Sequence, residues 1–461
     1  MFIKKYFAPI ILTFIIALNL FLGFSRLGTY SAVDEPYWTY GRTAKFWTAI
    51  AKQKWRSTNI NDKPGITVAI LSGFGLLKYD PMQYESMRGD AKTPQQLADL
   101  DAINFYFRLP IFLFATFSLL GFYFLLKKLF GQTTALLGFV FLGLSPILLG
   151  ISLIINPDSL LWIFLPMSLL CYMVFQQEQK TKYLIATGIF LGLSLLTKYV
   201  ANLLYVFFFA LPFLEYILAT EKPPLKEFLK KAFRNYAFIT AISLATFYAL
   251  FPATWLHPKM LLEGTFLSKA FEKTWPFFVG LVALIALDTT LLKNKITEPI
   301  LNFFSQHKQK LIFALGLIFL GLIIFVLADV YLGMKPFDLE GILSSPKGIG
   351  IGEVGLAKAA TGAILANVYS LIFGLSPLVL FFFIVALLGI LKKEINLTIE
   401  KKAVIYFSLF ILLYYLASTA NDVIATVREF QPRTVLGEFF SRNEFIFLLV
   451  ISLSIVFSYP H

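Results

Sequence analysis

The stretch Ile111–Leu126, IFLFATFSLLGFYFLL, decides the fold of this chain. It contains no charged residue and, with its flanks, reaches the roughly 20 residues that a helix needs to cross a bilayer core. Similar runs occur at Ile10–Gly23, Phe313–Leu327 and Phe381–Leu391. Because no water is available there to bond backbone groups, each run must be helical. The sequence therefore predicts an all-α integral membrane protein.

The composition of the whole chain agrees with this prediction. Of its 461 residues, 58% are hydrophobic and 15% are charged, whereas a soluble chain carries about a quarter charged residues. A net charge of +13 would suggest nucleic acid on a soluble protein. Here a bias of Lys and Arg toward the cytoplasmic loops explains much of it, so we expect membrane lipids and no nucleic acid as partners. The single cysteine, Cys171, lies in a predicted helix and provides no disulfide framework.

The hydropathy pattern predicts about twelve spanning helices in one domain, residues 1–461. They lie near 7–24, 103–126, 132–151, 158–175, 183–200, 201–219, 236–255, 276–292, 311–330, 368–391, 403–419 and 444–459. Lys and Arg concentrate in the short loops that share a side with the N-terminus, which predicts cytoplasmic N- and C-termini. No endoplasmic-reticulum retention signal closes the sequence, and we expect a multi-pass protein of the plasma membrane.

Two long loops face outward in this topology. The first, residues 25–102, contains Tyr40–Trp55, which mixes cations with aromatic residues, and Gly65–Lys78, which is apolar but too short to span. Both are typical of amphipathic helices that lie in the membrane interface. The second loop, residues 331–367, is rich in Gly and Pro. Its Gly350-Ile-Gly-Glu-Val-Gly355 matches a dinucleotide-binding pattern in letters only, because no βαβ unit surrounds it.

Ionisable residues from separate segments are predicted to meet at the outer interface. They are Asp34, Glu35, Asp62, Lys63, Arg108, Asp158, Lys198 and His257. A charged side chain placed within the membrane is energetically costly, and such residues usually mark a functional site. A carboxylate can take the proton of an acceptor hydroxyl, and cations can hold the charge of a departing phosphate. A carboxylate and a histidine can share a divalent ion. The set is typical of a site for sugar-phosphate displacement on the outer face.

The same residues have structural interpretations that the sequence leaves open. Asp34 and Glu35 could be loop acids or a helix N-cap, and Asp62-Lys63 could form a turn. Asp158 could cap a helix, the cations at helix ends could snorkel, and the histidine could simply be solvated. Two other functions also remain open, a secondary transporter and a non-catalytic subunit of a membrane complex. Transporters concentrate polar groups at the bilayer midplane, whereas the charges here are predicted at the outer rim.

At these positions the sequence resembles the GT-C membrane glycosyltransferases, in the branch of the protein O-mannosyltransferases and the aminoarabinose (lipid A) transferases. The matching segments are Asp34-Glu35, Asp62-Lys63-Pro64, Arg108-Leu-Pro110, Asp158 and Gly192-Leu-Ser-Leu-Leu-Thr-Lys198. The resemblance is strongest over residues 25–200. This chain has Asp62-Lys-Pro-Gly65 where the family often has Glu-Lys-Pro-Pro.

The resemblance implies an inverting hexosyl or pentosyl transfer on the outer face. The donor is a polyprenyl-phosphate sugar, and the acceptor is a glycan, a lipid or a protein. In this interpretation Asp34, followed by Glu35, is the base that activates the acceptor, and Asp158 supports the catalytic pocket. The residues expected to grip the donor phosphate are Lys63, Arg108 and Lys198. The candidate ligands of a divalent metal ion are Asp62 and His257.

Overall fold

The computed structural model describes residues 2–29, 32, 35–61, 64–81, 93–268, 271, 274–333, 361, 364, 365, 368, 369, 372, 377–391 and 397–420. The chain forms two compact units. Unit 1 contains Met1–Tyr205 and Asn235–Trp275, and unit 2 contains Val206–Arg234 and Pro276–His461. Two helices have several residues in each unit, α9 (Leu203–Leu218) and α10 (Leu225–Leu250), and the helix that begins at Trp275 has this one residue in unit 1.

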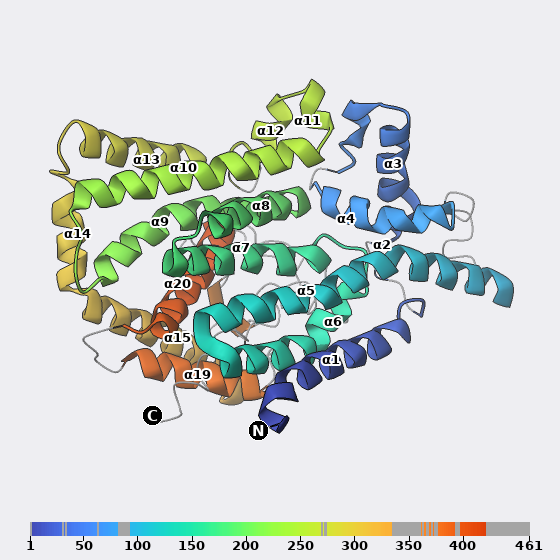
Figure 1. The fold of residues 1–461 in the computed structure, drawn as a ribbon, viewed down its shortest axis with the longest axis horizontal. Coiled ribbons are helices and arrows are strands. Elements are labelled where there is room, and N and C mark those ends of the chain that lie inside the picture. The colour runs from blue at the N-terminus through green and yellow to red at the C-terminus, as the bar shows by residue number, and fades with distance from the viewer. Residues whose placement is uncertain are drawn as a thin grey trace. The chain divides into compact units, whose positions relative to one another are not determined.

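Helices make up the regular structure of both units (Figure 1), and the described residues contain no strand. The other elements of unit 1 are α1 (Phe2–Phe24), α2 (Glu35–Tyr37), η1 (Trp38–Arg42), α3 (Thr43–Ala51), η2 (Trp55–Thr58), α4 (Ile66–Ser72), η3 (Gly73–Leu77), α5 (Pro94–Gly143), α6 (Pro146–Ser152), α7 (Asp158–Glu178), α8 (Thr181–Thr197), η5 (Tyr199–Asn202), α11 (Ala253–Leu256) and α12 (Lys259–Glu263). Those of unit 2 are α13 (Trp275–Thr290), α14 (Thr297–Gln306), α15 (Lys308–Tyr331), α19 (Pro377–Leu391) and α20 (Ile399–Ala420).

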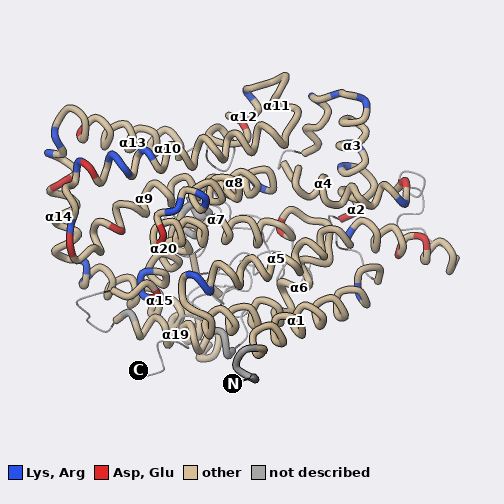
Figure 2. The backbone as a smooth tube through the Cα atoms, in the orientation of Figure 1, with Lys and Arg blue, Asp and Glu red and all other residues tan. Residues whose placement is uncertain are grey.

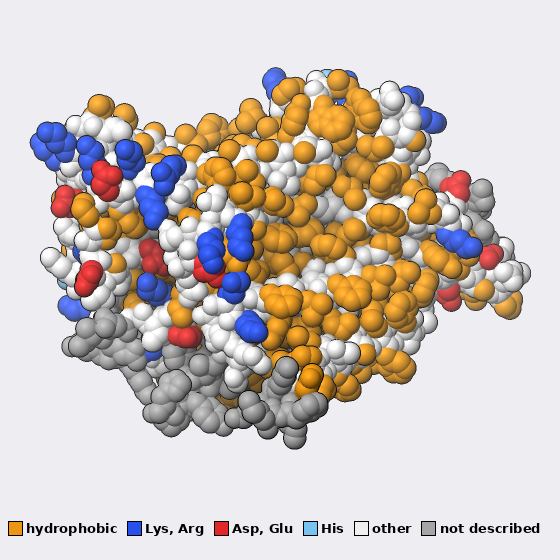
Figure 3. Space-filling view, viewed as in Figure 1, with side chains coloured by type: hydrophobic (Ala, Val, Ile, Leu, Met, Phe, Trp, Pro, Cys, Tyr) orange, Lys and Arg blue, Asp and Glu red, His pale blue; other side chains and the backbone are white. Residues whose placement is uncertain are grey.

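Among the described residues, five helices are long and apolar enough to cross a membrane: Tyr6–Phe24, Pro94–Gly143, Asp158–Glu178, Tyr199–Leu218 and Lys308–Tyr331. Charged residues gather at helix ends and connections (Figure 2), and hydrophobic side chains dominate the visible surface over α1 and α5 (Figure 3). The all-α membrane fold is therefore confirmed. The number of twelve spans stays a prediction, because segments such as 444–459 lie outside the described residues.

Helix α5 contains two predicted spans joined at a sharp turn. Gly131 has φ +80°, a left-handed conformation that suits glycine and reverses the chain between the two halves (Figure 1). The prediction of one continuous helix over 132–151 is wrong, because α5 ends at Gly143 and the short α6 follows. Ser145 accepts a hydrogen bond from Leu148 N (3.2 Å), and Pro146 occupies the first turn of α6. Serine at the N-cap and proline just inside are typical of a new helix start.

Residues 25–102, called the first outer loop after the topology that the sequence predicts, form several short helices where the sequence predicts two. The cation-rich stretch 40–55 becomes η1, α3 and η2, with Gln53 at φ +53° in the break before η2. The apolar stretch 65–78 becomes α4 and η3. Trp47 Nε1 donates to Ala69 O (2.8 Å), and the hydroxyls of Thr43 and Ser72 lie 2.9 Å apart. These contacts hold α3 against α4, so this part of the loop is a packed substructure.

Helix α7 is almost entirely buried, including most of its apolar residues. It packs on α8, where Ser168 Oγ donates to Thr187 O (2.8 Å). On α8, a Cβ added at Gly188 or Gly192 would come within 2.6 Å of side chains of α10. Small residues of this kind let membrane helices approach closely. Within unit 1, α8 therefore packs closely against both α7 and α10.

Candidate active site

Among the described residues of unit 1, the most enclosed ion pair joins Glu35 to Arg108. Arg108 Nε donates to Glu35 Oε1 (2.6 Å) and Arg108 Nη2 donates to Glu35 Oε2 (2.5 Å), while Arg108 Nη1 donates to Leu27 O (2.6 Å). Arg108 is 0% exposed and Glu35 is 2% exposed. Such a bidentate pair has fixed geometry. Removing either partner would leave the other charge buried without a counter-ion, which would strongly destabilise the fold.

Backbone groups complete the surroundings of the Glu35 carboxylate. Ile155 N donates to Oε1 (2.9 Å) and Ala32 N donates to Oε2 (3.2 Å). The carboxylate thus links the segment after α1, the first half of α5 and the loop that precedes α7. These contacts favour a positioning role for Glu35 and Arg108. The predicted catalytic role of Glu35 and the predicted contact of Arg108 with the donor phosphate stay predictions.

A second ion pair lies at the start of α7. Lys198 Nζ donates to Asp158 Oδ2 (2.9 Å), and the side chains of Lys198 and Asp158 are 15% and 0% exposed. Asp158 is the first residue of α7, where the positive end of the helix dipole favours a carboxylate. Lys198 follows the last residue of α8 in an extended conformation, with φ −158° and ψ 132°. Asp158 and Lys198, two of the residues predicted to gather at one membrane face, are thus in direct contact, and the cation is the more accessible partner. Their predicted roles in the catalytic pocket and in donor binding stay predictions.

The N-terminus of α4 is attached to the end of α8 that carries this pair. Gly65 N donates to Thr197 O (3.2 Å), and the hydroxyls of Thr67 and Thr197 lie 2.7 Å apart. Thr197 immediately precedes Lys198 in the sequence. The first outer loop therefore reaches the Asp158–Lys198 pair through α4, as it reaches the loop before α7 through Glu35.

Gly65 allows this attachment because it has no side chain. Its φ is +60°, and a Cβ there would lie 2.0 Å from the Trp38 ring, which is itself 1% exposed. Arg42 lies over the same ring, with Cζ 4.9 Å from its centroid. The left-handed conformation and the close ring both require glycine at this position. Gly65 thus brings the end of the Asp62–Gly65 motif tightly against the rest of the loop.

Three of the predicted site residues, Asp34, Asp62 and Lys63, lie outside the described residues. His257 follows α11 and is half-buried. Near it Trp255 packs on Trp55 of η2, with ring centroids 5.3 Å apart, so α11 also borders the first outer loop.

The predicted metal site stays a prediction. Within the described ranges, no group of three His, Cys, Asp or Glu side chains could hold a metal ion. His257 is the described member of its predicted pair, and a lone histidine does not define a divalent site. No step of the chemistry proposed below uses a metal.

Several contacts of the site could not be found from side-chain chemistry. Ile155 and Leu27 act through backbone groups, and Thr197 through both its carbonyl and its hydroxyl. Asn156 Oδ1 accepts from Asp158 N (2.8 Å), which shapes the turn into α7. Its signal was the Asn156-Pro-Asp158 sequence, since Asn followed by Pro favours a turn.

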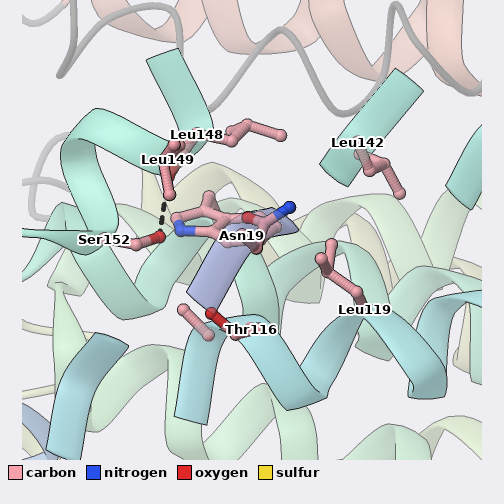
Figure 4. A pocket seen from close by; sticks show the side chains of 9 residues that line it. Asn19, Thr116, Leu119, Leu142, Leu148, Leu149 and Ser152 are labelled. Atoms are coloured by element: carbon pink, nitrogen blue, oxygen red, sulfur yellow. Dashed lines mark hydrogen bonds between the residues drawn. The ribbon is translucent and has the colours of Figure 1, made fainter. Parts of the chain in front are cut away.

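A small cavity elsewhere in unit 1 does not form part of this site. Asn19, Thr116, Leu142, Ser152 and Trp162 are among its lining residues, drawn from α1, α5, α6 and α7 (Figure 4). The lining includes no titratable side chain. It therefore offers neither a base nor a cation for the predicted reaction.

Comparisons with known proteins agree with the predicted resemblance. Residues 101–249 match the sequence model of a family described as dolichyl-phosphate-mannose-protein mannosyltransferase. The match includes Arg108, Asp158 and Lys198, and it confirms the resemblance to the GT-C membrane glycosyltransferases. No curated protein sequence matches significantly.

A solved structure, the oligosaccharyltransferase of Archaeoglobus fulgidus in the apo form, is similar at 13% identity with a TM-score of 0.46. The similarity covers 98% of this chain and 51% of that one, so the chain spans about half the length of that protein.

Proposed function

We propose that the chain is a membrane glycosyltransferase of the GT-C type that moves a sugar from a polyprenyl-phosphate donor to an acceptor at the outer face of the membrane. The observation that carries the proposal is the Asp158–Lys198 pair. Its cation is partly accessible, and its carboxylate is buried at a helix N-terminus. The family match over residues 101–249 supports the same chemistry.

In the proposed reaction, the acceptor hydroxyl attacks the anomeric carbon of the donor sugar. Its proton passes to the carboxylate of Asp34, and the bond from that carbon to the phosphate oxygen breaks. Polyprenyl phosphate leaves with the electron pair, and a single displacement inverts the anomeric configuration. A carboxylate base suits the first event, and fixed cations suit the charge that develops on the phosphate.

Lys198 is the described cation best placed for the phosphate. Asp158 fixes its ammonium group but uses one of three N–H donors, which leaves the others for phosphate oxygens. Lys63 is proposed to assist. Arg108 and Glu35 instead position the segment that contains Asp34, because their charges are satisfied within unit 1.

The proposal is tested by the variant Asp34→Asn in the purified full chain, reconstituted with a polyprenyl-phosphate sugar and a candidate acceptor. Removing a general base is expected to lower turnover by about 10²–10⁴-fold while donor binding is retained. Glu35→Gln serves as a comparison, and it is expected to lower the yield of folded protein as well as the activity. In cells, deletion should cause the sugar-charged lipid carrier to accumulate, measured by mass spectrometry. Normal turnover by Asp34→Asn would refute the assignment of the base.

A further inference from the structure

Unit 2 contains a helix whose exposed face is apolar although the helix is too short to span a membrane. Helix α14 lies between α13 and α15 and covers only Thr297–Gln306. Ile300, Phe303 and Phe304 are exposed, as is Ile296 just before the helix. These four positions follow the spacing i, i+4, i+7 and i+8, so they share one face.

The opposite face of α14 is docked on its own unit. Leu301 is buried in a cluster with Tyr216, Leu225 and Leu229, and Ser305 Oγ donates to Ile217 O (3.2 Å). Helix α14 therefore has a docked stripe and an exposed apolar stripe. A helix of this kind, between two apolar helices, is typical of the membrane interface.

The corner that precedes α14 is fixed by a buried carboxylate. Asp288, in the last turn of α13, accepts from Thr297 N (2.7 Å) and from Ile296 N (3.1 Å). It is 0% exposed. Because Asp288 caps the start of α14, this acid has a structural task, and the orientation of the apolar stripe is set by the fold.

Exposed cations surround the same cluster. The first turns of α10 carry Lys226, Lys230 and Arg234 at i, i+4 and i+8 on one face, while Leu225 and Leu229 turn toward the cluster. Further exposed cations flank α14, namely Lys293, Lys295 and Lys310. Figures 2 and 3 show Lys and Arg gathered over this part of α10 and the α13–α14 corner.

A further exposed cation, Lys222, lies just before α10 and contacts α14. Lys222 Nζ donates to Asn302 Oδ1 (3.2 Å) of α14 and lies 5.3 Å from the centroid of the Tyr216 ring. An ammonium group has three donors, and only one is used by Asn302. Lys222 thus places a cation against α14, next in sequence to the cationic first turns of α10.

We propose that α14 and the first turns of α10 form a binding surface for anionic phospholipids. Here the surface means Ile296, Ile300, Phe303 and Phe304 together with Lys222, Lys226, Lys230 and Arg234. The apolar stripe enters the acyl-chain boundary, and the cations bind the phosphate groups of the headgroups. Basic residues beside a membrane surface attract anionic lipid in this way. The surface lies apart in sequence from the proposed transfer site and does not depend on it.

The first test compares lipid binding to the purified full chain by native mass spectrometry, with phosphatidylglycerol and phosphatidylcholine as probes. The natural chain is expected to prefer phosphatidylglycerol. In the variant Lys222→Gln/Lys226→Gln/Lys230→Gln/Arg234→Gln, the ratio of phosphatidylglycerol to phosphatidylcholine affinity is expected to fall by at least about tenfold. Each cation near an anionic membrane surface contributes roughly fivefold in affinity. The control Lys127→Gln/Lys180→Gln/Lys182→Gln removes three cations of unit 1 and should keep it. Unchanged preference in the first variant would overturn the proposal.

The second test measures the position of the apolar stripe. Cys171→Ser removes the single native thiol, and Phe303→Cys or Glu298→Cys then carries a spin label in vesicles of phosphatidylglycerol and phosphatidylcholine. Position 303 is expected to be reached more by oxygen than by a water-soluble nickel complex, and position 298, exposed on another face of α14, the reverse. Greater nickel access at position 303 would place the stripe in water and overturn the proposal.

Discussion

The two ends of α7 carry ion pairs of opposite character. At its first residue, Asp158 is fully buried and its partner Lys198 is 15% exposed. At its last residue, Glu178 is 22% exposed, and its partners Lys128 and Lys180 are 42% and 60% exposed. Exposed pairs of this kind contribute little to stability. Solvation explains the charges at the Glu178 end, whereas the charges at the Asp158 end are enclosed and need another explanation.

The neighbourhood of the two ends shows the same contrast. In the loop before α7, Ile155 N donates a hydrogen bond to the Glu35 carboxylate. At the end of α8, Thr197 forms hydrogen bonds with Gly65 N and with the hydroxyl of Thr67. Segments far apart in the sequence therefore converge on the Asp158 end. An enclosed set of charges held by several segments is the arrangement expected of a functional site.

The largest effect is expected from Arg108, which secures the Asp158 end indirectly. Arg108→Met leaves the Glu35 carboxylate buried without its cation and should lower the free energy of unfolding by about 3–5 kcal/mol. Unfolding in detergent, followed by circular dichroism, measures this. Adding Glu35→Leu to the same chain removes the unpaired charge and should restore part of the loss. A single variant as stable as the natural chain would show that this pair does not hold the site.

The next effect concerns activity at Lys198. Lys198→Gln removes the accessible cation and should lower the rate of sugar transfer by about 10²-fold, as does the loss of a group that stabilises developing charge. Lys128→Gln is the matched control at the other end of α7 and should transfer sugar at the natural rate. Initial rates in reconstituted vesicles compare the two variants, with gel filtration to verify folding. Equal rates would remove the functional distinction between the two ends.

The sequence predicted this contrast only in part. Apolar runs predicted the helices, and the positions of Asp158 and Lys198 at helix ends placed both on the same predicted face, but the sequence did not identify them as a pair. The pairing of Glu35 with Arg108 was not predicted, since the choice of partner depends on the path of the chain after α1. Contacts at Ile155 and Leu27 use backbone groups, which have no signature in side-chain chemistry.

A smaller effect is expected where the first outer loop attaches near the Asp158 end. Gly65→Ala places a Cβ 2.0 Å from the Trp38 ring at φ +60°, so the loop must shift, at a cost of about 1–3 kcal/mol. Gly41→Ala is the control in the same loop, because a Cβ there meets nothing within 4 Å. Thermal unfolding of both variants tests the difference, and sugar-transfer rates should fall for Gly65→Ala alone. Similar unfolding midpoints for the two variants would contradict the tight attachment.

The smallest effect is expected at the Glu178 end. Glu178→Gln removes the charge that pairs with Lys128 and Lys180, but all three groups already contact solvent and regain its interactions. The unfolding midpoint should therefore not change measurably, at low salt or at high salt. Asp158→Asn, the same substitution in kind at the other end, leaves Lys198 without its buried partner and should lower the midpoint. If Glu178→Gln lowers the midpoint as much as Asp158→Asn, burial does not distinguish the two pairs, and the enclosed charges at the Asp158 end no longer point to a functional site.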